Sequence, residues 1–192
     1  MKVSCQFCKK EHEVNSRSND NFDLRAIPSV DNFTKNKLES ISKDRYQLGI
    51  YICPFCLLVQ VKESPPPELF YDSYIYESST SAEMHKNFED LVEKTSNYID
   101  KSEKNLKVLD IGCNDGLLLS KVKDKNPGYI LHGTDPSPVS RFNRVIDFTL
   151  FSEYFPGQGT KKKAPYDIIY ATNTFAHIPD LYQLILKLKK IL

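Results

Sequence analysis

Four of the five cysteines occur as two Cys-x-x-Cys pairs, a spacing typical of metal sites. The pairs are Cys5 with Cys8 and Cys53 with Cys56. A tight turn at each pair points both sulfurs the same way, and two such turns supply the four thiolates that tetrahedral zinc prefers. The alternative is two redox-active or merely buried pairs, because the long gap between them is less specific than a compact finger. We predict a structural Zn²⁺ held by all four.

A second group of residues lies in the stretch Val108-Leu-Asp-Ile-Gly-Cys-Asn-Asp-Gly116. Gly112 and Gly116 carry no Cβ, so the backbone can approach a ligand closely. Asn114 stands where such loops often have glycine, and asparagine is the other residue that best tolerates left-handed backbone. The spacing differs from Gly-x-Gly-x-x-Gly, which argues against a dinucleotide site. Asp110 suits a methyltransferase loop, in which an acid lies near the amino acid moiety of the cofactor.

An acidic residue follows the next apolar run at a spacing typical of nucleoside sites. Asp135 lies about 20 residues beyond Gly116, at the end of a predicted strand, where its carboxylate can accept hydrogen bonds from both ribose hydroxyls. The alternative is an acid that caps its own loop. Nothing in the sequence cradles a phosphate chain, so the pattern favours S-adenosylmethionine over NAD.

Candidate reacting groups follow a later apolar run, Tyr166–Ala171. Ligands in open α/β sheets bind beyond the carboxyl ends of strands, so we expect Asn173 and His177 in the reactive crevice. Imidazole takes or gives a proton near neutral pH, which makes His177 a candidate acid/base or orienting group; the alternative is a histidine hydrogen-bonded into its loop. The predicted cofactor-binding residues are Asp110, Gly112, Asn114, Asp115, Gly116, Asp135, Pro136 and Asn173.

The metal ligands fall in a predicted zinc-binding domain, residues 1–63. It contains a polar connection around Arg17–Asn21 and a strand-like run, Tyr51–Val61, rich in β-branched and aromatic residues. Ser64–Pro67 marks its boundary, because consecutive prolines continue neither helix nor sheet.

Residues 64–104 are predicted to form a linker with substrate-side tyrosines and one amphipathic helix. Apolar residues recur at helical spacing from Phe88 to Ile99. Thr80 and Glu83 have the spacing of a capping box at its start.

Residues 105–192 are predicted to be an incomplete S-adenosylmethionine-binding domain of alternating strands and helices. This alternation implies a parallel, doubly wound sheet, so the predicted fold class is α/β, a partial Rossmann-like sheet preceded by a small zinc-binding domain. The predicted strands are Lys107–Ile111, Tyr129–Thr134, Ile146–Leu150 and Tyr166–Ala171, and helices begin at Leu117 and near Asp180.

The composition excludes several classes of protein. The chain has 192 residues, 40% of them hydrophobic and 27% charged, so it can build a core. A net charge of +1 gives no support for a nucleic-acid partner. No apolar run is long enough to span a bilayer and the N-terminus lacks a signal peptide, so we expect a cytoplasmic protein without a membrane partner, in which disulfides are disfavoured.

The motifs together resemble the nucleotide-sugar C-methyltransferases that carry an N-terminal zinc-binding domain and act on keto-deoxyhexoses. The combination is specific, although the glycine loop alone would be weak. The similar stretches run in family order: Cys5–Cys8, Cys53–Cys56, Leu58–Gln60, Leu69–Ser79, His85, Asp110–Gly116, Gly133–Pro136 and Asn173–Asp180.

The resemblance implies a class I methyltransferase that uses S-adenosylmethionine and a nucleotide-sugar substrate. A base removes the acidic proton beside a keto group, and the enolate carbon attacks the donor methyl group. Tyr76, chosen over Tyr74, and His177 are the implied catalytic residues lining the sugar site. The zinc-binding domain is implied to shape one wall of the pocket without performing chemistry.

The sequence departs from the family at its end. It stops at Leu192, before the remaining strands and a C-terminal domain that holds a Tyr-His-Glu-His stretch of proton-transfer residues. We therefore expect a truncated enzyme that exposes part of its sheet, with a second chain as a candidate supplier of the missing strands. The alternative is a non-catalytic zinc-binding interaction module, and an NAD-linked sugar enzyme is disfavoured by the loop spacing.

Overall fold

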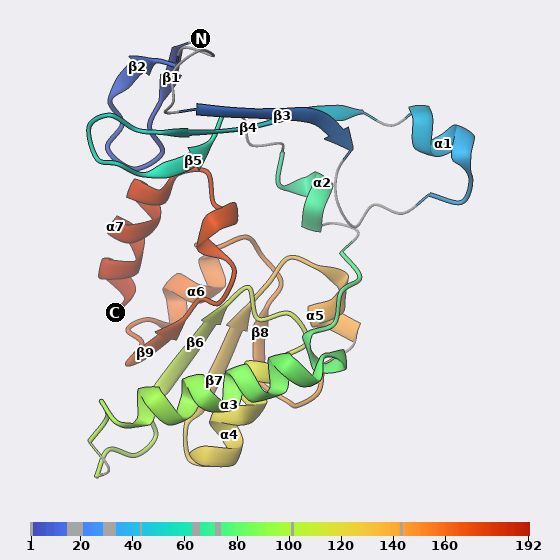
Figure 1. The fold of residues 1–192 in the computed structure, drawn as a ribbon. Coiled ribbons are helices and arrows are strands. Elements are labelled where there is room, and N and C mark those ends of the chain that lie inside the picture. The colour runs from blue at the N-terminus through green and yellow to red at the C-terminus, as the bar shows by residue number, and fades with distance from the viewer. Residues whose placement is uncertain are drawn as a thin grey trace. The chain divides into compact units, whose positions relative to one another are not determined.

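The computed structural model describes residues 2–14, 21–28, 34–42, 44–62, 66–71, 74–100, 102–142 and 144–192. The chain divides into two compact units, each described by itself below with the labels of Figure 1. The first comprises Met1–Ser73 and His177–Leu186, and the second comprises Tyr74–Ala176 and Lys187–Leu192. The predicted connection at Arg17–Asn21 and the predicted boundary at Ser64–Pro67 lie partly outside the described residues.

The first unit is built from short antiparallel strands. β1 (Lys2–Ser4) and β2 (Glu11–Glu13) form a hairpin. A three-stranded sheet has the order β3-β4-β5, with strands β3 (Asn21–Pro28), β4 (Arg45–Ile52) and β5 (Val59–Val61). The helices α1 (Lys37–Ser42) and α2 (Glu68–Tyr71) are each under two turns long.

The predicted strand Tyr51–Val61 is wrong in its middle. β4 ends at Ile52 and β5 begins at Val59. Between them the chain reverses in a turn closed by the Leu57 N–H, which donates to the Cys53 carbonyl over 2.9 Å, and Leu57 has a left-handed φ of 61°. The β-branched and aromatic residues fit a pleated surface, but they do not encode the turn that the cysteine pair imposes.

The second unit confirms the predicted parallel sheet. Its strand order is β8-β7-β6-β9, and every neighbouring pair is parallel. The sheet order reverses beside β6, because β7 and β9 flank it on opposite sides, and ligands of open α/β sheets bind at such switch points. The strands are β6 (Lys107–Ile111), β7 (Ile130–Thr134), β8 (Thr149–Phe151) and β9 (Ile168–Tyr170).

Helices alternate with the strands of this sheet along the chain (Figure 1). They are α3 (Ala82–Ser96), α4 (Leu117–Lys125), α5 (Pro138–Phe142), α6 (Gln158–Lys163) and α7 (Leu181–Ile191), whose residues are divided between the units. The 3₁₀ turns are η1 (Ser78–Thr80) and η2 (Phe175–His177). In the part of the chain that the structure describes, no helix has the length and apolar character needed to cross a bilayer.

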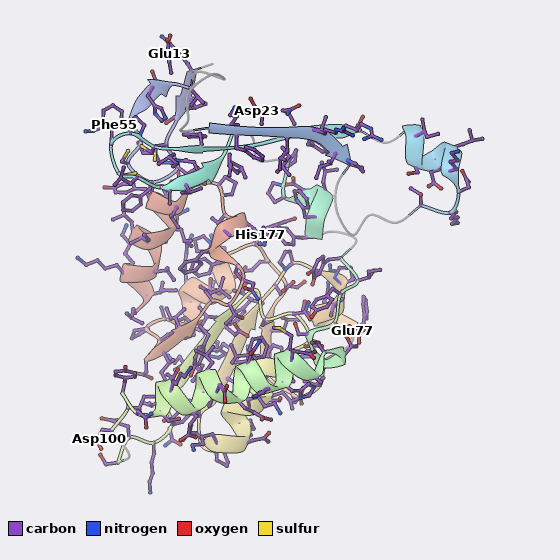
Figure 2. The ribbon with its side chains drawn as sticks, in the orientation of Figure 1. Glu13, Asp23, Phe55, Glu77, Asp100 and His177 are labelled. Carbon is purple, nitrogen blue, oxygen red and sulfur yellow. The ribbon has the colours of Figure 1, made fainter. Side chains whose placement is uncertain are left out.

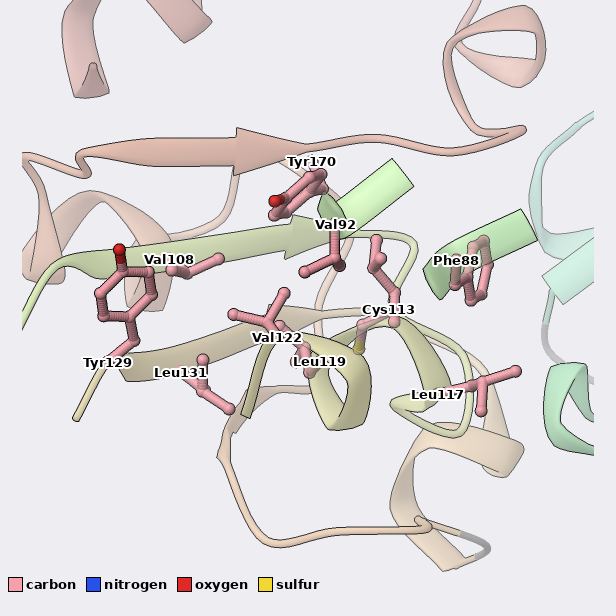
Figure 3. Packing of buried hydrophobic residues seen from close by; sticks show 11 residues of the cluster. Phe88, Val92, Val108, Cys113, Leu117, Leu119, Val122, Tyr129, Leu131 and Tyr170 are labelled. Atoms are coloured by element: carbon pink, nitrogen blue, oxygen red, sulfur yellow. The ribbon is translucent and has the colours of Figure 1, made fainter. Parts of the chain in front are cut away.

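Apolar side chains pack on both faces of β6. On one face Val108 belongs to a cluster with Phe88 of α3 and Val122 of α4 (Figure 3). On the other face Leu109 packs with Tyr166 and Ile191. Successive residues of a strand point to opposite faces, and each fully buried aliphatic side chain stabilises the fold by about 1.5–3 kcal/mol. The two clusters hold the carboxyl end of β6 in place.

Helix α3 begins one residue later than the predicted capping box. Ser81 is the N-cap, and its Oγ accepts from the Met84 N–H over 3.3 Å. Thr80 instead ends η1 and donates its hydroxyl to the Glu77 carbonyl. The capping box predicted Thr80 as the N-cap, but Thr80 belongs to the 3₁₀ turn η1, so the N-cap is the next residue, Ser81.

Candidate functional site

The four predicted metal ligands come together in the first unit. The sulfurs of Cys5 and Cys56 are 3.6 Å apart, those of Cys8 and Cys53 are 3.7 Å apart, and all four lie within 4.8 Å of one another. They are free thiols, and the separations far exceed a disulfide bond of about 2.04 Å. Sulfurs bound tetrahedrally to zinc at about 2.3 Å stand about 3.8 Å apart, so the arrangement fits such a cation. The sulfur atoms lie near the labelled Phe55 in Figure 2.

The two cysteine pairs have the same local geometry. The Lys9 N–H donates to the Cys5 carbonyl over 3.1 Å, as the Leu57 N–H does to Cys53. Lys9 also has the same left-handed backbone, with a φ of 60°. Two equivalent turns therefore present two sulfurs each to one point, as the spacing predicted.

Gln60 contacts this site and was not predicted. Its Nε2 donates to Cys5 Sγ over 3.2 Å, and its Oε1 accepts from the Gln6 N–H over 2.8 Å. Burial raises the pKa of the Cys5 thiol, but N–H groups of Gln60, Cys8 and Phe7 outweigh it and lower that pKa to about 6. Hydropathy predicts the wrong buried residue in β5, because the apolar Val59 is 58% exposed while the polar Gln60 is only 6% exposed.

The second predicted site is the loop after β6. Gly112 and Gly116 have left-handed φ angles of 75° and 84°, and Asn114 has one of 50°. The space that a Cβ would occupy is filled by the chain itself: it would lie 2.4 Å from Thr174 Oγ1 at Gly112, and 2.5 Å from Phe148 at Gly116. Both positions therefore require glycine for backbone geometry and for the close approach of neighbouring segments.

We expect Gly112→Ala to lower the free energy of unfolding by about 2–5 kcal/mol, combining left-handed strain with overpacking. Thr174 cannot easily move, because its hydroxyl lies between the carbonyls of Ile111 and Thr172, at 2.9 and 3.0 Å, and donates to one of them. Gly128→Ala is the matched control, since its Cβ would meet nothing closer than 3.6 Å; we expect a change within about 0.5 kcal/mol. Urea denaturation measures both, and equal effects would contradict the stated cause.

Asp135 lies directly after β7, beside the glycine loop. The Gly112 N–H donates to the Thr134 carbonyl over 2.8 Å, which joins the ends of the two strands. The carboxylate of Asp135 accepts from the Asn114 N–H over 2.9 Å and from the Ser137 N–H over 2.8 Å. These two donors fix its orientation, and each oxygen keeps a further lone pair for a ligand.

Asp110 brings a second carboxyl group to the same place. Its Oδ1 is buried and has no hydrogen-bond partner among the described residues. Loss of solvation, together with the charge of Asp135, raises the pKa of Asp110 to about 8. A buried acceptor without a partner is unusual, so this oxygen is a candidate contact for a donor on a ligand.

The pKa of Asp110 predicts a dependence of stability on pH. An unfolded aspartate titrates near pH 4, so between about pH 4 and 8 the folded chain retains a proton that the unfolded chain has released. The contribution of Asp110 to stability is therefore greatest below pH 4 and is lost as the pH rises toward 8. We expect Asp110→Asn to remove this decline. Denaturation of both proteins between pH 6 and 8.5 measures it, and parallel curves would contradict the assignment.

Three further predicted site residues, Asn173, Pro136 and Tyr76, lie outside the glycine loop. Asn173 is exposed, and its loop is held at β6 by Thr174. The Pro136 carbonyl accepts from Arg141. Tyr76 is 42% exposed, and its ring meets that of Tyr74 edge-on with centroids 6.3 Å apart.

The two units divide the predicted residues between them. The second unit contains Asp110, Gly112, Asn114, Asp115, Gly116, Asp135, Pro136, Asn173 and Tyr76. His177, labelled in Figure 2, is exposed and belongs to the first unit.

Solved structures similar to this chain include several methyltransferases. Plantazolicin methyltransferase BpumL, in complex with a pentazolic desmethylPZN analog and SAH, is 22% identical over 56% of this chain and 43% of that chain, with a TM-score of 0.45. Coclaurine N-methyltransferase bound to N-methylheliamine and SAH is 19% identical over 66% and 39%, with a TM-score of 0.45. Magnesium protoporphyrin IX methyltransferase (ChlM) from Synechocystis PCC 6803 with bound SAM is 16% identical over 62% and 61%, with a TM-score of 0.42.

The chain therefore spans less than two thirds of each of these structures. No curated protein matches the chain. A family described as "methyltransferase domain" matches residues 82–192, which is more than half of the sequence and contains the sheet, the glycine loop and Asp135. The chain belongs to this methyltransferase domain family.

Proposed function

We propose that the chain binds S-adenosylmethionine and serves methyl transfer from it. One observation carries the proposal: in a chain of the methyltransferase family, the glycine loop after β6 and Asp135 after β7 meet at the carboxyl ends of adjacent parallel strands. Ligands of open α/β sheets bind at this edge.

The residues present fit the cofactor. Asp135 has acceptor capacity for the ribose hydroxyls, and its orientation is fixed by two backbone N–H groups. The unpartnered oxygen of Asp110 is an acceptor for the cationic amino acid end, whose positive charge would favour the ionised form of this carboxyl group. When bound, S-adenosylmethionine supplies an electrophilic methyl group on its sulfonium.

The substrate that we propose is a nucleotide-linked keto-deoxysugar, methylated at the carbon beside its keto group. The support is the sequence resemblance carried by the tyrosine-rich segment before α3 and by the segment containing His177. A base takes the proton from that carbon, a bond forms from the carbon to the methyl group, and the methyl–sulfur electron pair stays on sulfur. Tyr76 and His177 are the proposed proton-handling residues.

We further propose that the four cysteines hold a structural Zn²⁺. Four thiolates complete a tetrahedral shell and leave no open position for a substrate, so this ion stabilises the first unit and performs no catalysis.

Titration calorimetry of the zinc-loaded chain with S-adenosylhomocysteine tests the proposed function, with NADH as the comparison ligand. We expect a dissociation constant between about 1 μM and 1 mM for S-adenosylhomocysteine and no heat with NADH. A folded chain that binds only NADH, or neither ligand, would overturn the proposal. In the presence of S-adenosylhomocysteine, deuterium exchange at the carbon beside the keto group, followed by NMR, tests the sugar substrate.

A further inference from the structure

The glycine loop is hydrogen-bonded to the segment that carries the tyrosines. The Ser78 N–H donates to Asn114 Oδ1 over 2.9 Å, and Asn114 Nδ2 donates to the Tyr76 carbonyl over 2.9 Å. The Ser79 N–H donates to Asp115 Oδ2 over 2.8 Å. Three bonds thus join two segments far apart in sequence, and in each a loop side chain meets a backbone group.

Hydrogen bonds engage each polar atom of the two loop side chains at least once. Asn114 is buried, and one hydrogen bond engages each end of its amide. Asp115 is fully buried, and its second oxygen accepts from the Leu117 N–H over 3.2 Å. Both residues were predicted to bind the cofactor, but these contacts indicate that their side chains hold the loop and segment together.

Asn114 also reaches Asp135 by a separate route. Its backbone N–H donates to Asp135 Oδ2, the carboxylate that we propose for the ribose. One residue therefore connects the backbone of Tyr76 and Ser78, through its side chain, to the carboxylate of Asp135, through its main chain. Burial strengthens such a network, because water does not compete for its members.

The other end of the segment is anchored to α3. His85 Nε2 lies 2.9 Å from the Ser79 carbonyl, and Ser81 caps the helix. Glu77, labelled in Figure 2 at the start of α3, lies between the two residues that Asn114 holds. Tyr76, whose carbonyl Asn114 holds, remains partly exposed.

We propose that Asn114 is a positioning residue that couples the docking of residues 76–79 to the orientation of Asp135. The inference rests on the proposed function and assigns to the side chain of Asn114 a role other than contact with the cofactor. Asparagine suits this role for two reasons. Its amide supplies a donor and an acceptor at once, and it tolerates the left-handed φ of 50°.

Two substitutions break the connection from opposite sides. Asn114→Gly removes the amide but keeps the backbone N–H and favours the same φ. Ser78→Pro removes the N–H that donates to Asn114; proline suits the first residue of a helical turn, and Glu77 before it is extended. Thr80→Val is the matched control, because it deletes a hydrogen bond within the segment that does not reach the loop.

The experiment measures S-adenosylhomocysteine affinity and the hydrogen exchange of residues 76–81 in the full chain. We expect each of Asn114→Gly and Ser78→Pro to weaken affinity by about tenfold and to speed exchange in this segment while α4 stays protected. The double variant is expected to bind like Asn114→Gly alone, because both changes break the same connection. Thr80→Val is expected to bind like the wild type.

Other outcomes overturn the inference. Additive losses in the double variant would mean that Asn114 contacts the ligand itself, and unchanged affinity and exchange in Asn114→Gly would mean that the bonds do not position the segment. If the folded wild type binds no S-adenosylhomocysteine, the proposed function fails. The exchange comparison between wild type and Asn114→Gly then still decides whether the side chain holds residues 76–79.

Discussion

Replacement of Asp135 by alanine is expected to weaken S-adenosylhomocysteine binding by at least about 100-fold. A carboxylate that accepts from two ribose hydroxyls contributes two charge-assisted hydrogen bonds, each of about 1.5–3 kcal/mol. The substitution also leaves the N–H groups of Asn114 and Ser137 without their acceptor, which loosens the loop. Calorimetry with wild type and variant measures the loss.

A ligand lacking the ribose 2′-hydroxyl separates the direct contact from the loosened loop. The wild type should bind 2′-deoxy-S-adenosylhomocysteine about tenfold more weakly than the parent ligand, whereas Asp135→Ala should not distinguish the two. Asp124→Ala, at an exposed position on α4, is the charge-matched control and should change neither affinity. Equal discrimination by wild type and Asp135→Ala would show that Asp135 does not hold the ribose.

Removal of the proposed Zn²⁺ is expected to unfold the first unit and leave the second folded. The buried apolar residues of the first unit are few among those described: Cys5, Val14, Tyr51, Cys53 and Leu184. Two of the five, Cys5 and Cys53, are proposed metal ligands. Both apolar clusters belong to the second unit. Structural zinc contributes about 10–16 kcal/mol in small domains that depend on it, which is more than so small a core can replace.

Hydrogen exchange followed by mass spectrometry, with and without a strong chelator, measures this effect. Protection should be lost in β4 and β5 and kept in β6 and α4. Cys8→Ser should lose bound zinc, whereas Cys113→Ser should keep a full equivalent, because Cys113 is buried in the cluster beside β6. Retained protection of β4 in the metal-free chain would contradict the prediction.

The parallel sheet was predictable because its strands are short apolar runs separated by helical patterns. β6 has the predicted bounds, Lys107–Ile111, and β7 differs by one residue. The third predicted strand, Ile146–Leu150, is shifted, since β8 covers Thr149–Phe151. The length of the apolar runs and their alternation with helical patterns thus located the strands. The ends of β8 depend instead on its pairing with β7.

The unpredicted parts of the sites depend on contacts distant in sequence. The spacing of cysteines predicted the cluster, but burial of Gln60 against Cys5 arises only when two strands meet. Likewise, the sequence gives no sign that Asn114 and Asp115 bond the backbone of residues 76–79. Every residue type offers the same backbone groups, so a sequence does not show which of them a side chain will bond. Such roles become apparent only in the folded structure.

The close approach of the Cys5 sulfur to that of Cys56, and of the Cys8 sulfur to that of Cys53, has a consequence for synthesis on the ribosome. The first cysteine pair emerges early, but Cys53 and Cys56 are joined to the chain only after β3, α1 and all of β4 have been made. Bringing such distant segments together has an entropic cost, which precedes the formation of a complete four-sulfur metal site. The N-terminal sulfurs must therefore remain reduced, or be held by a temporary ligand, until translation has passed residue 56.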